Sequence, residues 1–127
     1  MSICETQGVK VMARPSYLSE QSQPQRNRWV WSYEITIVNE GDETIQLVDR
    51  HWIITDSGGE VEEVRGDGVI GQQPVIPAGE TFSYQSFCPL STDYGFMRGS
   101  FGMTKTDGSR FEAAIAPFVL LTQAQLN

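Results

Sequence analysis

The segment from Trp29 to Ile37 alternates between apolar and polar residues and is the strongest constraint on the fold. Its apolar residues occupy every second position: Trp29, Trp31, Tyr33, Ile35 and Ile37. Ser32, Glu34 and Thr36 fall between them. Because side chains of a strand point alternately to its two faces, this period predicts a half-buried β-strand. One face of that strand must lie against a hydrophobic core.

Six other segments also resemble short strands, and turn-forming residues separate them. The seven expected strands are 9–18, 29–37, 44–56, 60–64, 81–87, 97–103 and 111–115. No segment has convincing helical periodicity. About seven short strands at regular spacing predict an all-β fold, an antiparallel β-sandwich of the immunoglobulin or fibronectin type III kind.

The apolar phase changes within segment 44–56. Ile45 and Leu47 share one parity, whereas Trp52 and Ile54 share the other. A one-residue slip of this kind predicts a β-bulge or kink near Asp49, Arg50 and His51.

Other residues suggest where the sheets end and turn. Pro15 predicts an edge strand over 9–18, since proline cannot donate to a sheet ladder, and segment 60–64 is acidic and edge-like. Turns are expected at 39–42, 56–59 and 106–109, where Asn, Asp, Gly and Ser cluster.

The 127 residues suit one domain, with a core over about 9–118 and flexible tails at both ends. The net charge of -7 argues against nucleic acid as a partner.

No apolar run approaches the roughly 20 residues that cross a bilayer, and no signal peptide pattern precedes Leu18, so we expect a cytoplasmic protein without membrane contact. Cys4 and Cys88 have no CxxC spacing and are expected to be free thiols.

Segment 65–71 resembles a phosphate-binding loop. Gly66, Gly68 and Gly71 match the GxGxxG dinucleotide fingerprint, and Arg65 precedes them. In its working form the motif opens a helix, but Pro74 and Pro77 follow too soon for a long helix. We therefore favour a structural loop, with an anion or ligand loop formed by these four residues as the alternative.

The sequence offers no set of residues for catalysis or for a metal. His51 is the single histidine, so a His pair cannot form, and no serine has a GxSxG context. We expect His51 to be a hydrogen-bonded structural residue at the bulge, rather than a ligand or a catalyst. We expect no enzyme activity, no cofactor, no metal site and no catalytic residue.

Several motifs together resemble the bacterial ApaG family. They are RHWIITD at 50–56, VRGxGVxGxxP at 64–74, PxGExFxY at 77–84, and Gly99–Met103 with Asp107, Gly108 and Phe111. The resemblance covers about 9–118 and implies a fibronectin-type sandwich. It also implies an association with cobalt and magnesium tolerance, and a role in binding other proteins, as related domains do inside eukaryotic proteins. No catalytic residue set comes with it.

Two functional hypotheses follow. The first is a non-enzymatic protein-interaction module of the ApaG family whose interaction surface contains Trp29, Arg50, His51 and Trp52. Its partner is a protein of unknown identity, and a homodimer through the same surface is an open alternative. The second is a small phosphorylated-ligand or pyrophosphate-binding protein that uses the glycine-rich loop.

Overall fold

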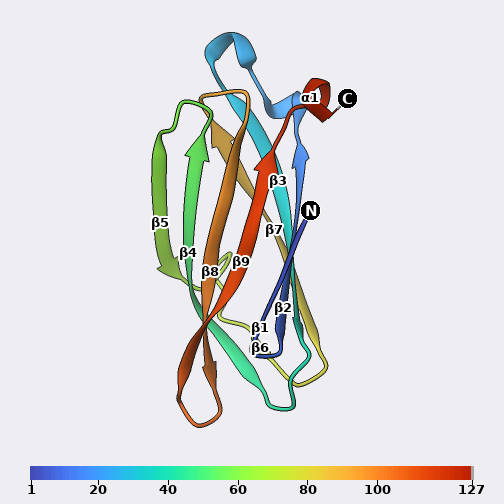
Figure 1. Cartoon of the computed structure of the whole chain (residues 1–127), viewed down its shortest axis with the longest axis vertical. Coiled ribbons are helices and arrows are strands. Elements are labelled where there is room, and N and C mark those ends of the chain that lie inside the picture. Colours follow the sequence, from blue (N-terminus) through green and yellow to red (C-terminus); the bar gives the residue numbers. More distant parts are fainter. Residues whose placement is uncertain (127) are drawn as a thin grey trace.

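The computed structural model describes residues 1–126, whose strands form two antiparallel sheets packed as a sandwich (Figure 1). The predicted sandwich is therefore confirmed. The first sheet has the order β1, β2, β3, β7. Its strands are β1 (Ser2–Thr6), β2 (Val9–Tyr17), β3 (Trp29–Asn39) and β7 (Thr81–Leu90).

The second sheet has the order β5, β4, β8, β9, and a short strand β6 also pairs with β4. Its strands are β4 (Ile45–Asp56), β5 (Val61–Asp67), β6 (Val75–Ile76), β8 (Gly95–Lys105) and β9 (Arg110–Leu120). The strands number nine in the described chain, two more than expected, because the sequence pattern overlooked β1 and β6. Both are short, and neither contains a long alternation.

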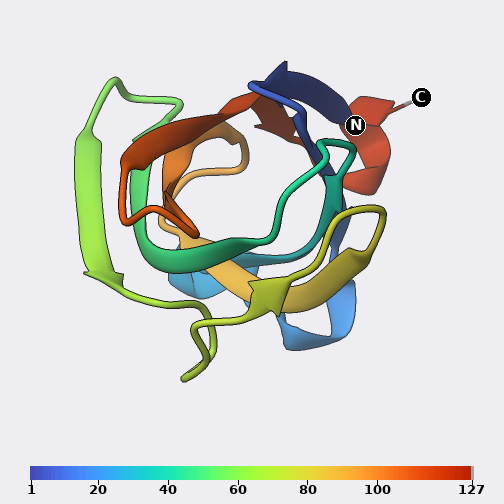
Figure 2. The same cartoon turned by 90° about the horizontal axis from the view of Figure 1, so that it is seen from below.

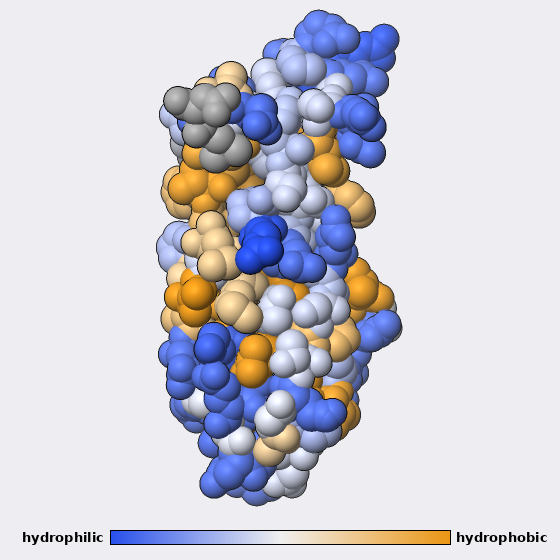
Figure 3. Space-filling view, turned by 90° about the vertical axis from the view of Figure 1, so that its right-hand side faces the viewer, coloured by the Kyte–Doolittle hydropathy of each residue, from blue (hydrophilic) through white to orange (hydrophobic). Residues whose placement is uncertain are grey.

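Helical structure is limited to three short elements, η1 (Ser19–Gln21), η2 (Pro24–Arg26) and α1 (Gln123–Leu126). The loop that holds η1 and η2 projects at the top of the molecule in Figure 1 and is strongly hydrophilic in Figure 3. No helix within residues 1–126 is long and apolar enough to span a membrane.

The core lies between the sheets and follows from the alternation in β3. Trp31, Ile35 and Ile37 are fully buried, as the period of two requires. Aromatic rings join the two layers: the ring of Trp52 lies 5.3 Å from that of Tyr33, and it also meets Phe101 and Phe118 edge to face. Such edge-to-face contacts add to the stabilisation that burial itself gives.

The β-bulge predicted in segment 44–56 is confirmed. The register between β4 and β8 shifts between Leu47 and Asp49. The shift lets Leu47 and Trp52 both point into the core although their positions differ in parity. It also turns Arg50 inward and His51 outward, and this decides the geometry of the site below.

The chain termini differ from the expectation of flexible tails. Residues 2–6 form β1, which pairs with β2 and packs beside β9. At the other end Leu120 is fully buried, and the backbone carbonyl of Leu121 accepts a hydrogen bond of 2.8 Å from the indole of Trp31. A buried indole N–H needs an acceptor, so this end of the chain is held against the core. Asn127 lies outside the described residues.

Strand β2 is not the edge strand that Pro15 suggested, because it lies between β1 and β3. The partners of β1 extend only from Val9 to Ala13. Pro15 therefore falls beyond the last pair, where no strand among residues 1–126 pairs with that side of β2, and the missing N–H costs no hydrogen bond there.

Turn chemistry at 39–44 carries the chain from one sheet to the other. Asn39 is buried, and its side-chain amide donates 2.9 Å hydrogen bonds to the carbonyl oxygens of Glu43 and Ile76. Its side-chain oxygen accepts from the N–H of Gly41. This one residue therefore ties β3 to the start of β4 and to β6. The expected turns at 56–59 and 106–109 do close hairpins, β4 to β5 and β8 to β9.

The two sides of the sandwich differ. On one side β1 and β2 pack against β9. On the other side β5 stands apart from β7 (Figure 2), and no pairing joins these two strands within residues 1–126. The face turned to the viewer in Figure 3 mixes hydrophobic and hydrophilic residues without one continuous apolar patch.

Candidate functional site

The glycine-rich loop has a structural explanation for each of its three glycines. At Gly68, φ is +62°, and a β-carbon would lie 2.2 Å from the carbonyl oxygen of Gln72. At Gly66 a β-carbon would lie 2.7 Å from Nη2 of Arg50. Gly71 has φ of +78° in open space. Glycine is therefore needed here for a tight turn and for a close approach of Arg50.

The polar groups of this loop are largely used within the protein. The N–H of Gly68 donates to the carbonyl of Val48, and Val69 and Gln72 exchange backbone hydrogen bonds of 2.8 and 2.9 Å. Nη1 of Arg50 donates to the carbonyl oxygens of Asp67 and Gly68, each at 3.0 Å. These contacts hold the loop from inside, as expected of a structural loop. Three of its N–H groups are already engaged and do not point at a ligand.

Arg65 lies on the outer face of the second sheet, away from the loop interior. It lines a pocket of about 300 Å³ together with Asp49, His51, Gly66 and Asp67. Arg65, Gly66 and Asp67 thus share one pocket, whereas Gly68 and Gly71 do not line it. The four residues of the expected anion loop are only partly brought together.

Charged pairs cover the rest of this outer face. Nη1 and Nη2 of Arg110 donate to the two carboxylate oxygens of Asp49 at 2.6 and 2.8 Å, and Arg110 also contacts Glu112 at 2.8 Å. The hydrogen bond from Arg110 lowers the pKa of Asp49 below its ordinary value. Nε2 of His51 lies 3.0 Å from Oε1 of Glu63. Among residues 1–126 no three His, Cys, Asp or Glu side chains gather closely enough to hold a metal ion.

The residues expected to form one interaction surface point in different directions. Trp52 is only 3% exposed and faces the core, as does the side chain of Arg50, whereas His51 faces outward. Trp29 begins β3, opposite Leu90 of β7, and packs partly against the core. Adjacent strand residues face opposite sides, so Arg50 and Trp52 lie on one side of β4 and His51 on the other.

The open side of the sandwich contains two neighbouring cavities, which we call the β5–β7 groove. The inner cavity, of about 340 Å³, lies between the sheets and includes Tyr33, Arg50, Trp52, Cys88 and Met97 in its lining. The outer cavity, of about 500 Å³, lies near the ends of β4, β5 and β7. Three residues line both cavities: Ile54, Glu62 and Pro89. The two are therefore parts of one groove.

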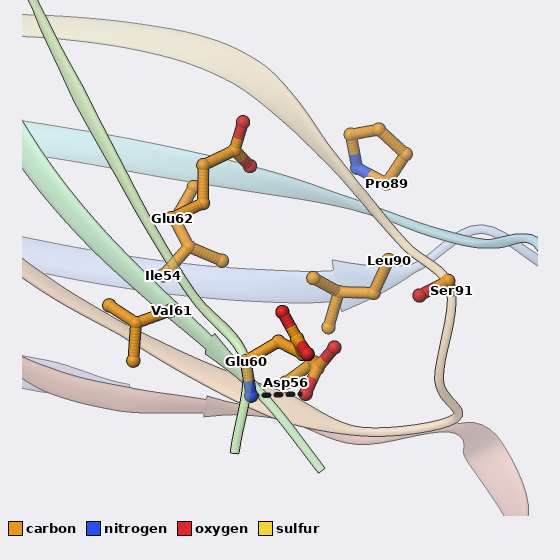
Figure 4. A pocket seen from close by; sticks show the side chains of 8 residues that line it. All are labelled: Ile54, Asp56, Glu60, Val61, Glu62, Pro89, Leu90 and Ser91. Atoms are coloured by element: carbon orange, nitrogen blue, oxygen red, sulfur yellow. Dashed lines mark hydrogen bonds between the residues drawn. The ribbon is translucent and has the colours of Figure 1, made fainter. Parts of the chain in front are cut away.

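The outer cavity has an apolar floor and an acidic rim (Figure 4). Leu90 and Ile54 supply apolar surface, and Asp56, Glu60 and Glu62 supply three carboxylates. Oδ1 of Asp56 accepts hydrogen bonds from the backbone N–H groups of Gly58 and Glu60, which fixes its position in the β4–β5 turn.

Tyr33 and Cys88, which line the inner cavity, ionise only with difficulty. Burial raises the pKa of Tyr33, while the positive charge of Arg50 acts in the opposite direction. Burial also raises the pKa of the Cys88 thiol to about 12, and the charge of Glu62 adds to this shift. Both groups are neutral at pH 7, so Arg50 and Glu62 are the charged residues in the lining of this cavity.

Sequence reasoning missed the groove. One signal for it exists: segment 81–90 contains no charged residue, although the chain as a whole has 25 charged residues, 9 basic and 16 acidic. That segment is β7, an edge strand that ends its sheet. The signal acquires meaning only when the strand order is known, because an uncharged strand in the middle of a sheet is ordinary.

Known proteins resemble this chain over most or all of its length. The family model for the ApaG domain matches residues 19–105. Protein ApaG from Anaeromyxobacter dehalogenans is 49% identical over 127 residues, which is 100% of both chains. Protein ApaG from Rhodospirillum centenum is 52% identical over 115 residues, covering 91% of this chain and 88% of the relative.

Solved structures agree with these sequence matches. The crystal structure of a Bordetella pertussis protein described as ApaA superposes with a TM-score of 0.88 at 45% identity, covering 91% of this chain and 94% of that one. The family model spans well over half of the chain, and relatives near 50% identity span nearly all of it. This chain therefore belongs to the ApaG family.

Proposed function

We propose that this protein is a non-enzymatic protein-interaction module and that a partner binds in the β5–β7 groove. One observation carries the proposal: β7 is a ten-residue edge strand without a single charged residue. An edge strand presents unpaired N–H and C=O groups to any strand that approaches it. Soluble proteins usually protect such edges with charges, prolines or bulges. In β7 only Pro89, near its end, has that effect.

Apolar surface accompanies the uncharged edge. Phe87 of β7 and Val61 of β5 are exposed on opposite sides of the groove, and Leu90 is partly exposed between them. A strand added to β7 would cover part of this surface and gain backbone hydrogen bonds at once, which is a common mode of peptide recognition. The groove thus supplies both the edge and the pockets that such recognition needs.

The chemistry of the groove supports binding more than catalysis. At neutral pH the Cys88 thiol is protonated, since its pKa is raised to about 12, so it is a poor nucleophile. His51 lies on the other face of β4, where its ring nitrogen is 3.0 Å from Glu63. The single histidine is therefore not placed beside the Cys88 thiol to activate it.

The phosphorylated-ligand alternative has less support. In the loop of Gly66, Gly68 and Gly71, the N–H groups of Gly68, Val69 and Gln72 are engaged in internal hydrogen bonds, and Arg50 donates to two of its carbonyl oxygens. We further propose that the protein acts in the cytoplasm, and that the cobalt and magnesium tolerance associated with the family acts through the bound partner. Two free cysteines are compatible with a reducing compartment.

Affinity capture from cytosol with three forms of the chain tests the proposal. Phe87→Asp places a charge on the β7 edge at a side chain that is 60% exposed, so the fold is retained. Val119→Asp is the matched control, because Val119 is 52% exposed on β9, away from the groove. We expect one defined protein to be retained by wild type and Val119→Asp and lost by Phe87→Asp. Equal retention by all three forms would show that the groove is not the interface.

A further inference from the structure

The charges along the β5–β7 groove are unevenly distributed. Its outer cavity has Asp56, Glu60 and Glu62, and no basic side chain lines it among residues 1–126. Its inner cavity shares Glu62 with the outer one and is otherwise mainly apolar, with Trp52, Ile54, Val64, Phe87 and Met97 in its lining. The positive charge of Arg50 is directed to the carbonyl oxygens of the glycine-rich loop. A ligand along the groove therefore meets apolar surface first and negative charge next.

The two cavities are spaced as the side chains of one added strand would be. The inner cavity is lined by β7 residues 86–89 and the outer one by residues 89–91. In an extended segment, side chains on the same face recur every second residue, about 6.7 Å apart. A strand paired with the β7 edge would thus place one inward side chain at the inner cavity, and the next or second next at the outer cavity.

We propose that the groove binds an extended, basic segment of a partner protein, in which an apolar side chain enters the inner cavity and a lysine or arginine follows two or four residues away. The inference rests on the proposed function and names the chemistry of its partner. The apolar side chain covers the partly exposed Ile54 and Val64, and the cation lies against the carboxylates of Glu60 and Glu62. Backbone hydrogen bonds to β7 supply affinity without regard to sequence, so the two side chains decide selectivity.

A second copy of this chain is a poorer occupant. The chain carries 16 acidic and 9 basic residues, and its own β7 has no lysine or arginine for the acidic rim. Pairing of two β7 edges would also bring two acidic rims into one assembly, which increases repulsion. A basic partner relieves this charge instead.

Three synthetic eleven-residue peptides test the inference on the intact chain. The first has lysine at positions 1 and 11, valine at the other odd positions and threonine at the even ones, so both lysines share the valine face and either strand direction can place a cation. The second has glutamate at both ends. The third repeats the first with every internal backbone amide N-methylated, so that neither of its edges has N–H groups to pair with β7. Backbone amide shifts of the ¹⁵N-labelled protein report where each peptide binds, and the titration gives its Kd.

We expect the lysine peptide to shift amides of β7 and to bind at least tenfold more tightly than the glutamate peptide in low salt. The preference should shrink in about 0.5 M salt, since screening weakens exposed charge pairs. The N-methylated peptide should not bind. In the double variant with Glu60→Lys and Glu62→Lys, the glutamate peptide should bind more tightly than the lysine peptide. The control is the double variant with Glu5→Lys and Glu43→Lys, which changes the net charge equally at exposed positions elsewhere. It should keep the preference for the lysine peptide.

Two results would overturn the inference. Equal affinity for the lysine and glutamate peptides would remove the charge selectivity, while the proposed function would still stand if Phe87→Asp abolishes capture. A second copy would be the occupant if no amide of β7 shifts with any peptide and light scattering shows a dimer that dissociates in Phe87→Asp. Loss of the Phe87→Asp effect on capture would instead contradict the proposed function itself.

Discussion

The guanidinium of Arg50 lies directly against Gly66, so closely that a β-carbon on that glycine would be 2.7 Å from Nη2. Arg50 reaches this position because the bulge in β4 turns it inward, and its two hydrogen bonds to Asp67 and Gly68 fix the loop that follows. A residue that looks like a surface charge in the sequence is therefore an internal support of the glycine-rich loop.

Substitutions of the loop glycines should differ in cost according to what each β-carbon meets. Gly68→Ala should lower the free energy of unfolding by about 3 kcal/mol, because φ is positive and the carbonyl of Gln72 is a rigid obstacle. Gly66→Ala should cost about 1–2 kcal/mol, since a flexible arginine can move. Gly59→Ala, at positive φ but in open space, is the control and should cost about 1 kcal/mol. Urea unfolding measures all three, and equal losses would contradict this order.

Removing the amide of Asn39 should weaken the link between the sheets. Asn39→Ala removes the hydrogen bond to the carbonyl of Ile76 and the acceptor for the N–H of Gly41, so we expect the free energy of unfolding in urea to fall by about 2–3 kcal/mol. Asn39→Asp keeps the acceptor but loses both donors. It should be at least as destabilising at pH 7, where its negative charge would face carbonyl oxygens. A variant as stable as wild type would show that the turn does not depend on this residue.

The ion pair between Asp49 and Arg110 should make a small contribution that depends on pH. The pKa of Asp49 is lowered in the folded state, mainly by the hydrogen bond from Arg110. Its stabilisation is therefore complete above the ordinary Asp pKa of 3.8 and is lost as the pH falls through the lower folded value. The free energy of unfolding of wild type should exceed that of Asp49→Asn by about 0.5–1 kcal/mol at pH 7. The difference is small because both side chains of the pair are partly exposed.

Chemical denaturation of both forms at pH 7, 4 and 2 measures this difference, which should decrease as the pH falls below 3.8. Arg110→Lys serves as a second comparison, since lysine cannot form the two parallel hydrogen bonds. A difference that stays constant with pH would contradict an ionic origin.

The two cysteines should react at very different rates. Cys88 is buried and its pKa is raised to about 12, so hardly any thiolate exists at pH 8. Cys4 is only partly buried in β1. We expect iodoacetamide at pH 8 to alkylate one thiol in the native protein and two in urea, as counted by mass spectrometry. Peptide mapping should place the native modification on Cys4, and rapid modification of Cys88 would show that the groove opens.

The sequence by itself determined the class of fold, the turns and the bulge. Each depends on local information: the period of two from Trp29 to Ile37, the turn residues at 56–59, and the change of phase between Leu47 and Trp52. The resemblance of local motifs was sufficient for the family as well, because RHWIITD and its companions lie in contiguous stretches.

The sequence predicted the acidic edge at 60–64, which is β5, but only the tertiary structure decided the edges of the other sheet. Pro15 suggested an edge in β2, but β1 covers the first part of that strand, and the uncharged β7 forms the edge instead. It also decided that Arg50 points inward and His51 outward, and that Asp56 and Glu62 come beside Leu90. These facts depend on the pairing of strands far apart in the sequence, and a period of two carries no information about which strand lies next to which.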